Sequence, residues 1–168
     1  MDAILETERL ILRQFTIDDT KFILELVNSQ GWIANIGDRN IKTNEQAKVY
    51  LQNGPLKSYT LNGFGLWLVE VKSDKTSIGM CGIIKRDNLE NPDIGFAFLP
   101  AFTGKGFAYE IANATLAFAI NTLKIPVILG ITIPANKASI KLLEKIGLKF
   151  SKTFNLPNNP NALMLFST

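Results

Sequence analysis

Apolar residues recur at helical spacing in four segments of the chain. Spacings of three and four residues place them on one face of each helix. Asp18 or Asp19 is expected to cap the first helix, and Thr43 with Gln46 forms a capping box that opens the second. Gly147 is expected to end the last of the four helices. The pattern predicts helices at about 22–27, 43–54, 105–124 and 136–147.

Strand-like runs occupy most of the remaining chain. Short polar turns separate three of them, at 65–72, 78–86 and 94–99, and favour antiparallel hairpins. The run 127–133 is apolar throughout, which predicts a central strand buried on both faces. The segment around Trp32 is expected to be a loop. Further strands are predicted at 7–15, 148–154 and 162–167. This order predicts a mixed α/β (α+β) sheet covered by helices.

Length and composition predict one domain over residues 1–168. The chain contains no linker-like stretch and no internal repeat. Its beginning, MDAILETERL, lacks the features of a secretory signal, and no apolar run approaches the ~20 residues of a membrane helix. With a single cysteine, Cys81, these features lead us to expect a cytoplasmic protein that binds no membrane.

Charge and missing residue types narrow the chemistry. The net charge is +3, but the lysines are scattered and no basic run alternates with aromatic residues, so we expect no nucleic-acid partner. The chain has no histidine, which removes Ser-His-Asp and Cys-His catalysis and the usual zinc sites. We expect no metal, and we expect Cys81 to be a buried, inert thiol.

The stretch PAFTGKGFAYEI, residues 100–111, carries two glycines at the entrance of a predicted helix. A glycine inside a helix costs about 1 kcal/mol relative to alanine. A Walker loop is excluded because Gly106 follows Lys105, and a dinucleotide fingerprint fits poorly because residue 109 is Tyr. Two interpretations remain open: a tight strand-to-helix turn, or main-chain N–H groups that bind a phosphate at the helix N-terminus.

The surrounding motifs resemble the acetyl-CoA-binding half of a GNAT acetyltransferase. IGMCGI, NPDIGFAFLP, GKGFAYEI and NKASIKLLEKIGLKF follow one another in that family's order and spacing. ETERLILRQF followed by TIDD resembles the start of the ribosomal-protein N-acetyltransferase branch (RimJ/RimL-like). The resemblance covers nearly the whole chain and implies the GNAT fold, with about seven strands in a mixed sheet, helices on both faces, and splayed fourth and fifth strands.

The same resemblance implies where acetyl-CoA binds. Main chain at the end of the fourth strand would hold the pantetheine arm like an added strand, and the glycine-containing turn would hold the diphosphate. At Ala101, many members of the family carry Arg or Gln. The implied cofactor-binding residues are Phe98, Leu99, Thr103, Gly104, Lys105, Gly106, Phe107, Ala108, Asn136 and Ser139.

The implied reaction is direct attack of an amine on the thioester in a ternary complex. Ser139 is the candidate donor to the departing sulfur, although an early-helix serine also bonds to its own backbone. Asp93 is the candidate base, acting through water, although a strand-edge residue in a turn has the same appearance. Asn136 is expected to cap its helix, to contact the cofactor, or both.

Four other residues have two interpretations each, and Glu110 has one. Glu70 either faces the acceptor groove or lies on a solvated strand face, which we expect, and Glu110 is expected to stabilise the first turn of its helix. Lys105 either pairs with a phosphate or is simply exposed. Trp32 either walls the acceptor site or anchors a loop, and Tyr109 meets either cofactor or solvent.

The acceptor is expected to be a protein or peptide N-terminal amine. An α-amino group has a pKa of about 7.7–8.0, against about 10.4 for lysine, so its neutral form is easier to reach without histidine. Alternatives are a small amine (polyamine, amino acid or aminoglycoside) and a non-catalytic CoA-binding module. The chain is expected to be a monomer or a homodimer, since sheet edges can pair between subunits.

Overall fold

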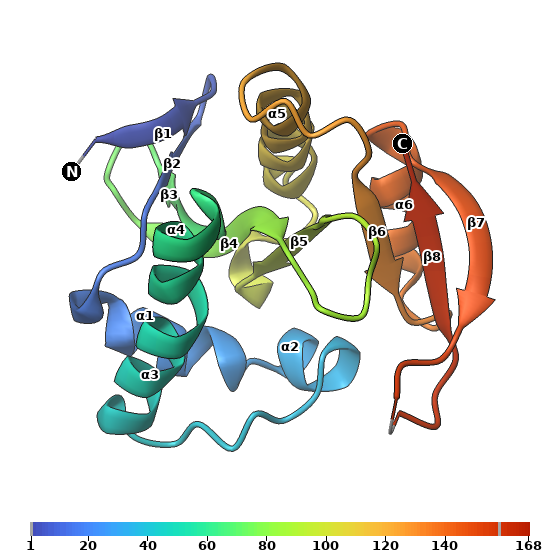
Figure 1. The fold of residues 1–168 in the computed structure, drawn as a ribbon. Coiled ribbons are helices and arrows are strands. Elements are labelled where there is room, and N and C mark those ends of the chain that lie inside the picture. The colour runs from blue at the N-terminus through green and yellow to red at the C-terminus, as the bar shows by residue number, and fades with distance from the viewer. Residues whose placement is uncertain (1, 158) are drawn as a thin grey trace.

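Helices cover both faces of one open sheet (Figure 1). The computed structural model describes residues 2–157 and 159–168. The elements are β1 Ala3–Glu6, β2 Leu10–Arg13, α1 Thr20–Val27, α2 Gln30–Asn35, α3 Asn44–Leu51, α4 Lys57–Asn62, β3 Leu66–Val71, β4 Ser77–Ile84, β5 Asp93–Phe98, α5 Phe107–Asn121, β6 Leu129–Thr132, α6 Lys137–Lys145, β7 Lys149–Phe154 and β8 Leu163–Ser167. Eight strands lie in the order β1-β2-β3-β4-β5-β6-β8-β7.

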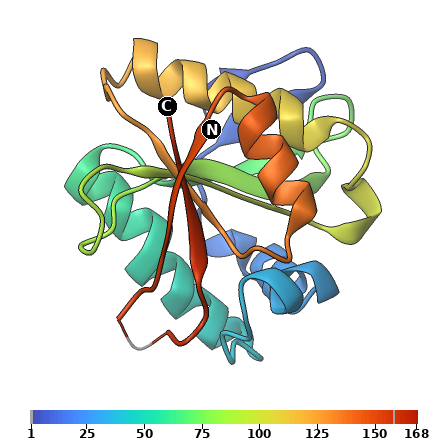
Figure 2. The same cartoon turned by 90° about the vertical axis from the view of Figure 1, so that its right-hand side faces the viewer.

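Two hydrophobic cores lie on opposite faces of the sheet. Side chains alternate along each strand, so Val69 of β3 packs into one core while its neighbour Leu68 packs into the other. The first core contains Ile111 and Leu116 of α5, and the second contains Leu26 of α1. Figure 2 shows α5 and α6 on one side of the strands and α1 to α4 on the other.

The sheet opens between β5 and β6. These two strands run parallel and pair at one level only, Asp93 with Leu129. On its other side, β5 pairs with β4 over six levels, from Gly79–Phe98 to Ile84–Asp93. Four residues of β5, 95–98, are only half-buried although the strand lies inside the sheet. The splay implied by the family resemblance is therefore confirmed, between the strands labelled β5 and β6.

The sheet has eight strands, one more than expected, because β1, Ala3–Glu6, was not predicted and lies before the predicted strand 7–15, of which residues 10–13 form β2. β1 and β2 pair antiparallel on either side of a turn at residues 7–9. The turn is held by Glu110, whose carboxylate accepts hydrogen bonds from Thr7 Oγ1 and the Arg9 main chain. A contact between residues this distant leaves no trace in a local pattern.

The N-terminal helices also differ from expectation. The segment around Trp32 is the short helix α2, and Trp32 is the buried residue of that helix. The helix expected to end near residue 54 continues as α4 to Asn62, because Pro55 lies in a single π turn, 52–56. The wider π turn accommodates the missing proline N–H and lets the helix continue.

The first helix is capped from further upstream than predicted. Thr16 and Asp19 form a reciprocal capping box around a 3₁₀ turn, 17–19, that precedes α1. Asp19 does occupy the N-cap position of α1, but its carboxylate bonds backward to the Thr16 N–H. Among the described residues, no helix is both long enough and apolar enough to cross a bilayer.

Candidate functional site

The N-terminus of α5 is left open by its own sequence. Gly106 is its N-cap and offers no side-chain acceptor, and the first intrahelical bond runs from the Glu110 N–H to the Gly106 carbonyl at 3.1 Å. The N–H groups of residues 107–109 therefore have no acceptor within the helix. The adjoining turn, 103–106, is exposed. Within the described chain, this helix start presents unpaired donors and the positive end of a helix dipole to solvent.

Both glycines are required by backbone conformation. Gly104 and Gly106 have φ of +73° and +80°, in the left-handed region that L-residues disfavour. A Cβ on Gly104 would meet nothing within 4 Å, so its surroundings are open. Residues 103–106 therefore form the tight strand-to-helix turn that was one of the two interpretations. The same turn leaves the N–H groups at the start of α5 exposed. Thr103 belongs to the turn itself, because its N–H and Oγ1 both donate to the Pro100 carbonyl.

The edge of β5 that faces the gap carries free main-chain groups. The Leu99 N–H donates to the Ile78 carbonyl of the neighbouring chain at 2.9 Å, and the Leu99 carbonyl accepts from Phe102. Since main-chain groups alternate sides along an antiparallel strand, those of Phe98 and Phe96 point toward β6. Pairing with β6 has ended at that level, so Phe98 faces the opening and Leu99 is bonded within the protein.

A second helix start lies at the same edge of the gap. β5 and β6 run parallel, so the turn after each strand lies at the same end of the sheet, as Figure 2 shows for the starts of α5 and α6. Asn136 is the N-cap of α6, and its Oδ1 accepts the Ser139 N–H at 3.1 Å. The predicted capping role of Asn136 is confirmed. Ser139 is half-buried, and its backbone rather than its hydroxyl makes this bond.

Asp93 lies at the closed end of the gap, where β5 and β6 still pair. Its side chain is 2% exposed, and its two oxygens accept from Arg86 Nε at 2.7 Å and Nη2 at 3.2 Å. Burial raises the pKa of Asp93, and the Arg86 guanidinium opposes that rise. The carboxylate is thus already engaged in an ion pair.

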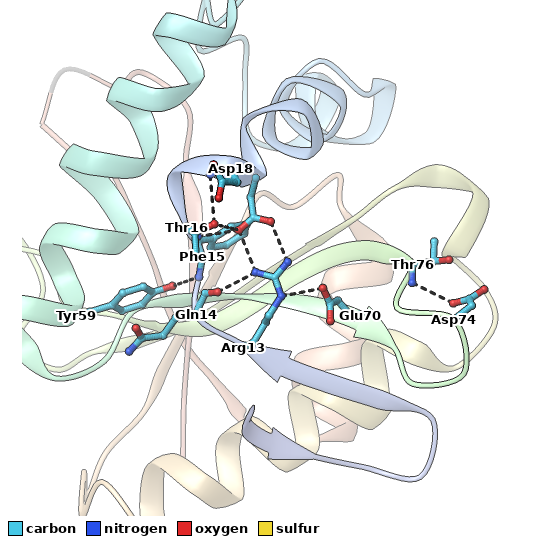
Figure 3. A network of polar contacts seen from close by, with 10 residues as sticks. Arg13, Gln14, Phe15, Thr16, Asp18, Tyr59, Glu70, Asp74 and Thr76 are labelled. Atoms are coloured by element: carbon cyan, nitrogen blue, oxygen red, sulfur yellow. Dashed lines mark hydrogen bonds and ion pairs between the residues drawn. The ribbon is translucent and has the colours of Figure 1, made fainter. Parts of the chain in front are cut away.

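Glu70 does not lie on a solvated face, contrary to expectation. It is 8% exposed, and its Oε1 accepts from Arg13 Nε at 2.8 Å, while Arg13 also bonds to both oxygens of Asp19 (Figure 3). Burial opposes ionisation of Asp19, but hydrogen bonds from Arg13 and Thr16 outweigh it and lower the pKa of Asp19. Glu70 belongs to β3, which β4 and β5 separate from the gap, so it does not face an acceptor there.

Glu110 contacts residues outside its own helix. Its carboxylate accepts from Thr7 Oγ1 at 2.6 Å, from the Arg9 N–H at 2.9 Å and from Arg9 Nε at 2.7 Å. Arg9 Nη1 in turn donates to the Lys105 carbonyl at 3.1 Å. We call Thr7, Arg9 and Glu110 the clamp, because they join the β1–β2 turn to the start of α5. The clamp was not predicted from the sequence, because Arg9 and Glu110 lie 101 positions apart in the chain.

The remaining candidates pack against neighbours. Lys105 Nζ lies 5.4 Å from the Phe102 ring centroid, and the Tyr109 ring lies beneath Lys145 Nζ at 4.2 Å. Burial raises the pKa of Cys81 to about 12, which confirms the predicted buried, unreactive thiol. Within the described residues, no group of three or more acidic or cysteine side chains could hold a metal ion.

Sequence comparison identifies the family. The model of the acetyltransferase (GNAT) domain matches residues 9–149, so the chain belongs to the GNAT acetyltransferase family. It is an N-acetyltransferase with the GNAT fold, and members of this family use acetyl-CoA. The uncharacterized protein YkkB of Bacillus subtilis is 36% identical over 103 residues, 60% of this chain and 60% of that protein. The uncharacterized N-acetyltransferase YoaA of the same organism is 29% identical, over 89% of this chain and 84% of its own length.

Solved structures share the fold at low sequence identity. The ribosomal-protein-S5-alanine acetyltransferase from Vibrio fischeri superposes with a TM-score of 0.82 at 19% identity, covering 99% of this chain and 96% of that one. RimL, a ribosomal L7/L12 alpha-N-protein acetyltransferase in complex with coenzyme A, superposes with a TM-score of 0.83 at 14% identity, covering 99% of this chain and 97% of that one. A chimera of the spermidine N-acetyltransferase SpeG from Vibrio cholerae superposes with a TM-score of 0.75 at 20% identity, covering 94% of this chain and 93% of that one.

Proposed function

We propose that this chain transfers the acetyl group of acetyl-CoA to the N-terminal amine of a protein or peptide, at the gap between β5 and β6. The observation that carries the proposal is the pair of unsatisfied main-chain surfaces at one edge of the gap. One is the start of α5, and the other is the free edge of β5 at Phe98.

These two surfaces fit two parts of coenzyme A, the diphosphate and the pantetheine arm. The N–H groups of residues 104–108 suit a diphosphate, which is anionic and needs close approach to the backbone. The edge of Phe98 suits the amide groups of the pantetheine arm, which would add to β5 as a strand does. Thr103 and Leu99 would contribute through position and packing, because their N–H groups bond within the protein.

Acetyl-CoA, when bound, supplies a thioester carbonyl that a neutral amine can attack. Ser139, in the first turn of α6, would donate its hydroxyl proton in a hydrogen bond to the sulfur. Asp93 would accept a proton only through water, since both of its oxygens bond to Arg86. Much of the rate would then come from holding the two reactants together.

The charge around the gap favours an α-amine over a polyamine. A polyamine carries several positive charges and needs free carboxylates, whereas Asp93, at the closed end of the gap, is already paired with Arg86. An α-amino group needs no such partner and deprotonates near neutral pH. The names of two structural neighbours, which act on ribosomal proteins, support this choice, and the spermidine N-acetyltransferase supplies the alternative.

Release of free thiol from acetyl-CoA, measured with a panel of amines, tests the proposal. We expect turnover with short peptides bearing a free N-terminus and none with the same peptides blocked by N-acetylation. Faster turnover of spermidine than of every peptide would show that the acceptor is a polyamine and not an N-terminal amine. Binding of CoA with no turnover of any amine would identify a non-catalytic module.

The role of Ser139 has its own test. We expect Ser139→Ala to lower kcat about tenfold and to leave KM for the peptide unchanged, because the lost hydrogen bond forms as the thiolate departs. Ser151→Ala, on the exposed strand β7, is the matched control. An unchanged kcat in Ser139→Ala would remove Ser139 from the mechanism.

A further inference from the structure

Two exposed lysines of the edge strand β7, Lys149 and Lys152, lie on the side of the sheet opposite α6. Phe150, between them, packs edge-on against Phe166, which belongs to the first core together with Leu143 of α6. The ladder pairs Lys149 and Lys152 with the two neighbours of Phe166 in β8. Since side chains alternate along a strand and paired residues share a face, both lysines point away from α6.

These two lysines lack an opposing carboxylate. Within residues 2–157 and 159–168, neither of them takes part in an ion pair. The sequence 145–168 contains no Asp or Glu, so β7, β8 and the loop that joins them supply none. Asp87 and Glu90, in the loop before β5, are exposed and do not reach them. Residues 137–152 contain five lysines and one glutamate, so this segment alone has a net charge of +4 in a chain of net charge +3.

The lysines lie on the side of the sheet from which an amine would enter the gap. The inference rests on the proposed function, which seats CoA between the starts of α5 and α6 and so fills the gap from their side (Figure 2). Ile94 of β5 belongs to the first core, so the side chain of the neighbouring Asp93, the candidate base, points to the opposite side. One row of paired residues runs from Asp93 through β6 and β8 to Lys149. The candidate base and the lysines therefore share one face.

The width of this face sets how far along a bound peptide the lysines would act. Neighbouring strands lie about 4.8 Å apart, so β7 is about 10 Å from β6 and about 15 Å from a thioester held in the gap. An extended chain covers about 3.3 Å per residue, which brings about its fourth or fifth residue to β7. Before that point the peptide passes Ile131 and Leu165, which offer no partner to a charged side chain.

We propose that Lys149 and Lys152 select acceptor polypeptides that carry a carboxylate at about the fourth or fifth residue. The acceptor would place its α-amine in the gap, cross β6 and β8, and meet the two lysines at the edge of the sheet. Charge complementarity defines this occupant, because unpaired cations attract a carboxylate and repel both a polyamine and a basic peptide. The contact lies far from the thioester, so it should change KM for the acceptor and leave kcat unaltered.

Short peptides that differ only in the position of one Asp test the proposal, with release of thiol from acetyl-CoA as the measurement. With Asp at the fourth or fifth residue, we expect a KM about fivefold lower than with Asn there, the effect of exposed ion pairs. Asp near the far end of the peptide should give no such advantage. The advantage should also disappear at about 1 M salt, where the Debye length is about 3 Å.

Charge variants of the lysines sharpen the test. In the double variant Lys149→Gln/Lys152→Gln, the KM values for the Asp and Asn peptides should become equal. Lys149→Glu/Lys152→Glu should reverse the preference and favour a lysine at the same peptide position, a reversal that a purely structural role cannot produce. Lys141→Gln/Lys145→Gln is the matched control, because it removes two exposed charges from α6 on the other side of the sheet and should leave the preference intact.

The outcomes separate this inference from the function on which it rests. If the wild type acetylated peptides but made no distinction between Asp and Asn, the role of the lysines would be overturned and the proposed function would stand. If no peptide were acetylated, both would be overturned.

Discussion

Two helices of this chain, α3 and α5, begin in opposite ways. At α3, Thr43 accepts the Gln46 N–H and the Gln46 side chain accepts the Thr43 N–H, so the sequence satisfies its own helix start. At α5, a glycine in the left-handed region stands at the N-cap and no side chain accepts from the first turn. The first arrangement stabilises the fold, whereas the second keeps main-chain donors available for a ligand.

The open start is stabilised from outside the helix. Glu110 lies in the first turn of α5, where its charge would repel a bound diphosphate, but Arg9 neutralises it at 2.7 Å. The clamp also holds the Lys105 carbonyl. α5 is therefore anchored through side chains on the β1–β2 turn, so that its amides need no cap of their own.

The largest expected effect comes from closing the open start. In Gly106→Ala, a Cβ is strained by about 1–2 kcal/mol at this left-handed φ and lies against Arg9. The turn relaxes, and binding has to restore it, so we expect the Kd for CoA to rise about thirtyfold. Titration calorimetry measures this change.

Gly54→Ala is the matched control for that substitution. Gly54 is exposed, and a Cβ there would meet nothing within 4 Å. Its replacement should leave CoA binding unaltered. If Gly106→Ala bound CoA as tightly as Gly54→Ala does, α5 would not hold the diphosphate.

An intermediate effect is expected from weakening the clamp. Glu110→Gln removes the charge that accepts from Thr7 and Arg9, and we expect the free energy of unfolding to fall by about 1–2 kcal/mol. Partial burial opposes ionisation of Glu110, but those hydrogen bonds outweigh it and lower its pKa. Its contribution is therefore present at neutral pH and is lost as pH falls below about 4.3, the unfolded value, through the folded pKa.

Urea unfolding at a series of pH values measures both parts of this prediction. The difference between the wild type and Glu110→Gln should be greatest near pH 7 and should shrink on acidification. A difference that stays constant down to pH 3 would show that the carboxylate charge contributes nothing to the clamp.

The smallest effect is expected at the capped helix. Thr43→Ala removes one arm of the capping box, and we expect a loss of about 1 kcal/mol in unfolding free energy. The Kd for CoA should not change, because α3 lies on the opposite face of the sheet from α5 (Figure 2). Weaker CoA binding in this variant would mean that the two helix starts are not independent.

Features set by neighbouring residues were predictable from the sequence. The capping box at Thr43, the cap at Asn136 and the left-handed Gly147 each follow from a few adjacent side chains. The two glycines before α5 marked the open helix start for the same reason. The splayed strands were implied only by the resemblance to the family, because the spacing of hydrophobic residues does not show over how many residues two strands pair.

Features set by distant residues were not predictable. Arg9 meets Glu110 across 101 positions of the chain, and Arg13 meets Glu70 across 57. Glu70 stands between two valines, which locally resembles a solvated strand face, and only its partner Arg13 explains its burial. The π turn at Pro55 was missed because proline ordinarily ends a helix, and an inserted wider turn cannot be read from composition.

The single matched level between β5 and β6 has a consequence for the whole molecule. The eight strands form a panel of five and a panel of three that share one short seam. On the proposed function, the pantetheine arm would complete that seam and join the panels as a member of the sheet. The supply of acetyl-CoA would then govern the rigidity of the protein as well as its turnover.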